Sequence, residues 1–428
     1  MSRSPAVFAT VLALLAPLAA QAAPATDVVD LGGTRAYVRA DAAVALTGIE
    51  LFVRAGLDRE TDHQNGAAAL VAETVLQTPV DGVPLVEAVD ARGGSLTFAV
   101  AAQYVRFYLE AQPDNIAPLA DLVARALHAP SFDPTTLAAA RGELGDRIAD
   151  TESDPRLVGL EMLRASYYRD GAGTPALGTA ASLLQLGPAD TRAFYTQWYL
   201  RGDAFVTVVG RTGTTVPSAG RALADALPAG TAPAAAIAVR PLTAQPKRMV
   251  THRGDVYSPY IVIGFGAPAL GDPDFPAALV MRSMLSDLFR QDEATTRPSV
   301  FRPVGSIYDY DVDPAQLALW VNGGQIDPSV GVAALDALVK AAASRPLESA
   351  VLARYRQRAR GEWALESLSL DERAWSIGNA VAHGLNADAA DQVGAAIDKV
   401  TPSDVERVAK KWFQRFDVAL VLPRGDGG

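Results

Sequence analysis

The sequence offers few side chains of the kinds that usually carry enzyme chemistry. It contains no cysteine, which excludes thiol nucleophiles, thiolate zinc sites and disulfide frameworks. Only four histidines occur, and no two of them lie near each other in the sequence (His63, His128, His252 and His383). Much catalytic chemistry is therefore excluded before any motif is considered.

The length and composition are those of a globular protein with more than one domain. A chain of 428 residues corresponds to two or three domains of ordinary size. Charged residues make up 20% and the apolar set 49%, which is too apolar for a disordered chain. The net charge of −10 argues against nucleic acids and anionic membranes as partners.

The first residues have the pattern of an export signal. Arg3 precedes an apolar stretch at residues 6–20, and Ala20-Gln21-Ala22 has the small-x-small form of a cleavage site. The stretch is short for a membrane span, and no later segment is long and uncharged enough to be one. We expect cleavage near Ala22 and a periplasmic or secreted protein, with an uncleaved membrane anchor as the alternative.

The rest of the chain is predicted to repeat one α+β unit. Residues 36–39, 43–54, 96–102 and 204–209 have the composition of strands, with helical segments between them. The second half follows the same order, and the helices before the last strands start alike, with Gly187-Pro188 and Thr401-Pro402. The alternative is coincidental order in two unrelated domains.

These features predict an α+β fold with two homologous α/β-sandwich domains, each a mixed sheet covered by helices. The predicted divisions are a signal peptide at 1–22, a first domain at 23–228, a linker at 229–247 rich in Ala and Pro, and a second domain at 248–428.

Several short segments, taken in order, resemble the pitrilysin/insulinase (inverzincin) metallopeptidase family. In the first half these are 52–66 (FVRAGLDRETDHQNG), 91–96 (ARGGSL), 131–134 (SFDP) and 193–210 (AFYTQWYLRGDAFVTVVG). In the second half they are 263–268 (IGFGAP), 272–275 (DPDF) and 400–405 (VTPSDV). The resemblance implies a half-clamshell of two domains, which in short members pairs with a second subunit, one of the two being catalytic.

The zinc motif of this family is degenerate here. Members carry H-x-x-E-H on the first helix, where histidines at i and i+4 bind zinc and the glutamate is the general base. Counted from Gly66, these positions are Ala69, Ala72 and Glu73. The family's third ligand falls near Asp146, with Glu143 and Asp150 as alternative registers. The resemblance therefore implies no zinc and no catalytic residue in this chain.

Substrate-binding positions of the family are only partly kept. The strand after Gly93-Gly94, on which substrates align, would present Thr97, Phe98 and Ala99. The arginine and tyrosine that hold the substrate backbone are missing at the expected spacing, where Ala294 and Phe301 stand. Arg297 with Tyr308 is a possible substitute pair, and the alternative is a solvated basic loop with strand aromatics.

The preferred function is that of a non-catalytic subunit of a periplasmic pitrilysin-type peptidase. It would pair with a zinc-bearing subunit and help to enclose peptides, with zinc only in the partner. One alternative is a divergent zinc metalloendopeptidase with relocated ligands. The other is a stand-alone peptide-binding or assembly protein.

Overall fold

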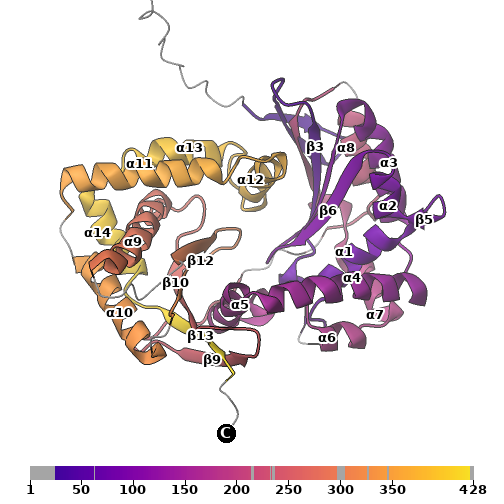
Figure 1. Ribbon diagram of the computed structural model, residues 1–428. Coiled ribbons are helices and arrows are strands. Elements are labelled where there is room, and N and C mark those ends of the chain that lie inside the picture. Colours follow the sequence, from indigo (N-terminus) through magenta and orange to yellow (C-terminus); the bar gives the residue numbers. More distant parts are fainter. Residues whose placement is uncertain are drawn as a thin grey trace, which may run out of the picture.

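Two β-sheets, one in each half of the chain, organise the molecule (Figure 1). The computed structural model describes residues 25–61, 63–213, 216–231, 233, 237–295, 304–324, 327–344 and 347–424. The predicted signal peptide and Arg297 lie outside these residues. Every helix within them is too short or too polar to serve as a membrane span.

The first sheet has the strand order β1-β2-β8-β3-β7-β6. Its strands are β1 (Asp27–Asp30), β2 (Arg35–Ala40), β3 (Thr47–Val53), β6 (Gly94–Val100), β7 (Val105–Ala111) and β8 (Phe205–Gly210). A small hairpin is formed by β4 (Pro79–Val80) and β5 (Val83–Pro84). The helices of this half are α1 (Ala67–Gln77), α2 (Leu85–Asp90), α3 (Pro113–His128), α4 (Pro134–Ser153), α5 (Pro155–Tyr167), α6 (Ala180–Gln185), α7 (Pro188–Trp198) and α8 (Val216–Asp225). Short 3₁₀ turns are η1 (Leu57–Arg59), η2 (Asp170–Gly173) and η3 (Arg201–Asp203).

The second sheet has the order β11-β12-β10-β13-β9. Its strands are β9 (Arg248–Arg253), β10 (Tyr260–Ala267), β11 (Val304–Asp309), β12 (Ala315–Asn322) and β13 (Asp417–Pro423). The helices are α9 (Phe275–Thr295), α10 (Pro328–Ser344), α11 (Ser349–Leu365), α12 (Leu370–Ala382), α13 (Ala389–Ile397) and α14 (Pro402–Trp412).

The two sheets repeat one topology, which confirms the predicted duplication. β2 pairs with β8 in parallel, as β9 does with β13, and the remaining neighbours of both sheets are antiparallel. With β1 set aside, β2-β8-β3-β7-β6 corresponds strand by strand to β9-β13-β10-β12-β11. Each half has its own apolar core between its sheet and its helices. In this correspondence α1 matches α9, because each follows the central strand β3 or β10.

Proline and a capping side chain fix where the helices start. The carboxylate of Asp133 accepts hydrogen bonds from the backbone N–H groups of Thr135 and Thr136 at the start of α4. Asp154 ends α4 and caps α5, so α5 starts at once in a new direction. That turn carries α5 away from its own half of the chain.

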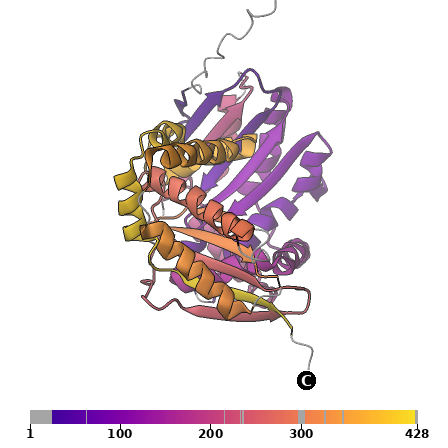
Figure 2. The ribbon, with the colours of Figure 1, turned by 60° about the vertical axis from the view of Figure 1, so that its left-hand side comes forward.

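The halves exchange one helix each across their interface. α5 packs on strands β10 and β13 of the second sheet, and α12 packs on β3 and β8 of the first. Figures 1 and 2 show α12 lying against the first sheet while the rest of the second half extends away from it. Glycines allow the close approach, because a Cβ at Gly159 would overlap Val262 and one at Gly378 would overlap the ring of Phe52.

Ion pairs also join the halves. Arg106 on β7 lies between Glu50 on β3 and Asp371 on α12, and Arg373 on α12 pairs with Asp41 at 3.0 Å. A cavity of about 730 Å³ lies at this junction, walled by the ends of β2 and β8 and by α11, α12 and α13. Polar and apolar contacts together therefore hold the two halves in one arrangement.

Candidate functional site: a degenerate metal site at the α1–α4 contact

The degenerate motif occupies a fully buried turn of α1. Ala69 and Ala72 are 0% exposed, and Glu73 is 4% exposed. The helix starts at Gly66, whose φ of 89° suits glycine. The carboxylate of Glu60 accepts hydrogen bonds from the N–H groups of Gly66 and Ala68 at 3.1 and 2.9 Å. Burial raises the pKa of Glu60 to about 7 despite these bonds.

Glu73 is engaged by neighbours from two helices. Gln77, one turn later on α1, donates from Nε2 to Oε1 of Glu73 at 2.9 Å. Nη1 of Arg147, on α4, lies 3.8 Å from the other carboxylate oxygen, Oε2. Burial raises the pKa of Glu73, Gln77 and Arg147 oppose that rise, and the negative charge of Glu143 adds to it.

The candidate third-ligand residues lie on the exposed side of α4. Asp146 is exposed, and the α4 carboxylate whose charge acts on Glu73 is Glu143. Glu143 and Asp146 are both exposed, and Glu143 lies three residues from Asp146 and four from Arg147 on one side of α4, so the charge effect on Glu73 is what distinguishes Glu143. Of the three candidate registers, Glu143 is the one whose charge acts on Glu73 in this structure.

These residues do not fit a catalytic zinc ion. Such a site normally takes three protein ligands and keeps one open position, whereas two of the motif positions here are methyl groups. Both oxygens of the remaining carboxylate face a donor, Gln77 or Arg147. In the described part of the chain, no group of three or more His, Cys, Asp or Glu residues is arranged to hold a metal.

Strand β6 runs beside this contact at the edge of the first sheet. Among the described residues β6 pairs only with β7, so its other edge is open. Thr97 is exposed, Ala99 is half-buried, and Phe98 points inward with 6% exposure. The guanidinium carbon of Arg147 lies 4.6 Å from the centre of the Phe98 ring, within cation–π range.

The predicted clamp pair is not assembled by the described residues. Arg297 lies outside them. Tyr308 is 7% exposed and its hydroxyl donates to the carbonyl of Pro268 at 2.6 Å, within the aromatic core of the second half. Because Tyr308 is committed to that core, the structure removes it from a substrate-binding role.

The second half contains the corresponding helix contact, with a different set of ion pairs and hydrogen bonds. α9 packs on α11 as α1 packs on α4. Arg358 of α11 donates to Asp287 of α9 at 3.0 Å and to Glu362 at 2.9 Å. A carboxylate on the first helix therefore faces an arginine on the second in both halves.

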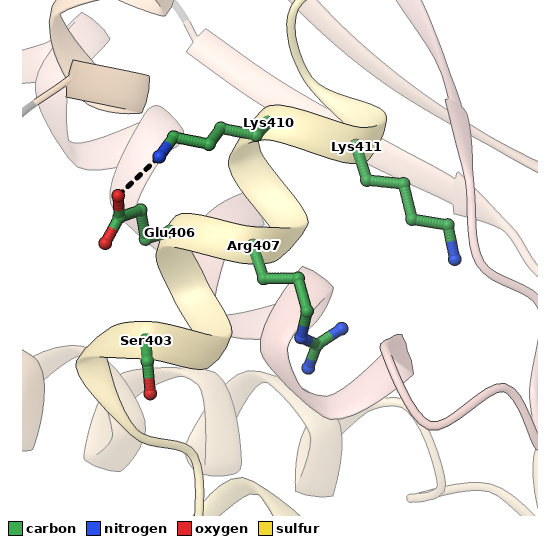
Figure 3. Close-up of a pocket in the computed structure, with 5 residues that line it drawn as sticks. All are labelled: Ser403, Glu406, Arg407, Lys410 and Lys411. Atoms are coloured by element: carbon green, nitrogen blue, oxygen red, sulfur yellow. Dashed lines mark hydrogen bonds and ion pairs between the residues drawn. The ribbon is translucent and has the colours of Figure 1, made fainter.

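A surface depression on α14 is another candidate, and its charges are used internally. Figure 3 shows its lining residues, with Lys410 paired to Glu406 at 2.5 Å. Arg407 and Lys411 both pair with Asp274, at the start of α9. These cations anchor α14 to α9, so the depression is not a built anion site.

The sequence predicts the motif positions and offers Glu143 as an alternative third ligand, but it does not show how α1 and α4 pack around Glu73. Gln77 and Glu143 each carry a local signal, because they stand four residues from Glu73 and Arg147 respectively. The pairing of Glu73 with Arg147 has no such signal, since it depends on how α1 and α4 pack. The exchange of α5 and α12 is likewise a tertiary property.

Comparison with known proteins gives this arrangement its class. Residues 37–180 match the family model described as insulinase (peptidase family M16). An uncharacterized zinc protease of Streptomyces coelicolor is 24% identical over 171 residues, which cover 39% of this chain and 37% of that relative.

Solved structures extend the likeness to the whole fold. A protease from Helicobacter pylori has a TM-score of 0.80 at 15% identity, covering 94% of this chain and 100% of that one. An inactive M16 peptidase domain from Pseudomonas fluorescens has a TM-score of 0.78 at 14% identity, covering 94% and 99%. At such identities the structures show the fold alone, which is the two-domain M16 fold. The chain therefore matches the insulinase family model in sequence over residues 37–180 and resembles M16 structures in fold over nearly its whole length.

Proposed function

We propose that this protein is a non-catalytic subunit of an exported pitrilysin-type peptidase. It pairs with a zinc-bearing subunit of the same family and helps to enclose peptide substrates. The observation that carries the proposal is the α1–α4 contact, where Ala69 and Ala72 replace the ligand and base and a guanidinium faces Glu73 at 3.8 Å. A pairing role is supported because the family's half-clamshell encloses a chamber only when two subunits face each other.

The open edge of β6 gives such a subunit a way to contact peptides. An extended peptide adds to an exposed strand through main-chain hydrogen bonds, with no need for a metal. Thr97 is exposed on this strand. The export signal at residues 1–22 supports action outside the cytoplasm, as proposed from the sequence.

Co-expression with a zinc-bearing family member encoded nearby tests the proposal. We expect a complex of roughly twice the monomer mass on size exclusion, with higher peptidase activity than the partner alone. Thr97→Pro should lower this activity without preventing association, because proline disturbs hydrogen bonding at the edge strand. Thr251→Pro, on the edge strand β9 of the other sheet, is the control for general strand damage.

Two results would contradict the proposal. Separate elution at micromolar concentration, with a fully active partner, would favour a stand-alone peptide-binding protein. Chelator-sensitive hydrolysis by this chain alone would favour a divergent metallopeptidase.

A further inference from the structure

The guanidinium of Arg147 is held in place without using its hydrogen-bond donors. It lies 4.6 Å from the centre of the Phe98 ring and 3.8 Å from Oε2 of Glu73. The second distance exceeds a hydrogen bond, and Arg147 donates none within the described part of the chain. Its side chain is 42% exposed, so its donors can be reached from solvent.

An arginine at the corresponding α9–α11 contact of the second half shows what a purely structural residue does there. Arg358 is 31% exposed and donates to two carboxylates, Asp287 at 3.0 Å and Glu362 at 2.9 Å. The corresponding helices therefore carry an arginine that donates two hydrogen bonds in one half and an arginine whose donors are unused among the described residues in the other. The difference points to a ligand for Arg147.

The surroundings indicate which kind of ligand. Phe98 belongs to β6, the strand with the open edge, and an added strand would lie about 4.8 Å from β6. Glu73 and Glu143 already place negative charge around the guanidinium, which disfavours an anion. A peptide carbonyl oxygen is a neutral acceptor that matches the planar fork of arginine donors.

We propose that Arg147 donates hydrogen bonds to the main-chain carbonyl groups of an extended peptide lying along the open edge of β6. The guanidinium thus serves as a peptide-positioning group at the place where active relatives hold a metal. This inference rests on the proposed function, since it assumes that the chain contacts peptides.

Binding of a capped, uncharged, fluorescein-labelled peptide rich in Thr, Val and Ser to the full mature chain tests this assignment. Fluorescence anisotropy should show Arg147→Gln weakening binding about ten-fold or more, the usual scale for losing hydrogen bonds to a charged donor. The affinity of Arg147→Lys should lie between those of wild type and Arg147→Gln, because lysine keeps the positive charge but lacks the planar, forked donors of arginine. Arg358→Gln is the matched control and should leave affinity unchanged, whatever it does to the melting temperature.

A second readout separates contact from a structural effect. The ¹⁵N NMR signal of the Arg147 side-chain Nε–H, assigned by its absence in Arg147→Gln, should shift when the peptide is added. Equal affinities of wild type and Arg147→Gln would overturn the inference, and so would an equal loss in Arg358→Gln. At least ten-fold tighter binding of an acidic peptide would overturn the carbonyl assignment in favour of a charge pair.

The failure of the proposed function is distinguishable from the failure of this inference. Association with the zinc-bearing subunit is measured separately and needs no peptide. If wild type associates but binds no peptide, the role of Arg147 is overturned and the subunit assignment stands. If it binds peptide through Arg147 but never associates, the subunit assignment falls and the peptide site stands.

Discussion

Glu73 keeps a carboxylate where its neighbours have lost the other groups that a metal would need. The carboxylate stays buried by accepting a hydrogen bond from Gln77 and by lying near Arg147. A buried charge is stable only when it is paired or hydrogen-bonded. Arg147 is therefore the cation that compensates Glu73 in this structure, as a metal ion does in a metal site.

A first prediction at this scale concerns rebuilding the metal site. Ala69→His, Ala72→Glu and Glu73→His together should bind zinc only weakly, because Arg147 places a positive charge beside the new ligands. Adding Arg147→Ala should raise zinc affinity by about ten-fold or more, since that repulsion is removed. Isothermal titration calorimetry with zinc measures both variants.

The variant that combines these three substitutions with Arg147→Ala also tests which carboxylate of α4 serves as the third ligand. Adding Glu143→Ala should abolish the gain, whereas Asp146→Ala should leave it intact, because Glu143 is the α4 carboxylate whose charge acts on Glu73. The opposite result would show that the register between α1 and α4 described here is wrong.

A second prediction concerns the charge of Glu73 and pH. Burial raises the pKa of Glu73 above its value in the unfolded chain. Between these two pKa values, the folded state therefore binds more protons than the unfolded state. The stability contributed by Glu73 is therefore present at low pH and lost as pH rises through the raised pKa. Glu73→Gln should be neutral or stabilising by up to about 1 kcal/mol near pH 8, and the difference should shrink toward pH 4.

Urea unfolding of wild type and Glu73→Gln across this pH range measures the effect. Asp146→Asn is the control, since this exposed side chain of α4 should show little difference. A loss of stability in Glu73→Gln that grows with pH would mean that pairing with Arg147 outweighs burial.

At the scale of helices and strands, the sequence predicts the repeat of the two halves but not the exchange of α5 and α12 between them. The order of strands and the paired helix starts at Pro188 and Pro402 follow from local patterns, and both helices are observed. The predicted strand at 43–54 is shorter in the structure, β3 at Thr47–Val53. Amphipathic spacing shows that α5 and α12 bury one face, but it cannot show that the buried face meets the other half.

The exchanged helices give a third prediction. Gly378→Ala should destabilise the protein by about 1–3 kcal/mol, because the added methyl overlaps Phe52. That ring cannot yield easily, since it stacks on Phe205 with centroids 4.7 Å apart. Thermal unfolding should show the loss, and hydrogen exchange should show it first in α12 and β3.

Gly361→Ala is the matched control for this substitution. Gly361 is an exposed glycine of α11, and a Cβ there would meet no atom within 4 Å. Alanine should stabilise that helix by about 0.5–1 kcal/mol. Equal effects of the two substitutions would mean that the close contact of α12 with the first sheet does not exist in solution.

At the scale of the whole molecule, the two halves are fixed to each other and one of them carries the degenerate site. The exchanged helices and the pairs of Arg106 and Arg373 span the interface. A fixed arrangement of the two halves is what the proposed non-catalytic subunit needs in order to shape one side of a chamber.

The zinc content of the purified protein decides whether its degenerate motif can still hold a catalytic metal. The mature chain is purified without chelator, incubated with excess zinc, desalted, and analysed for metal alongside hydrolysis of an unstructured peptide. We expect far less than one zinc per chain, below about 0.1, and no chelator-sensitive hydrolysis, because Arg147 faces the only motif carboxylate. About one zinc per chain together with chelator-sensitive hydrolysis would contradict this expectation.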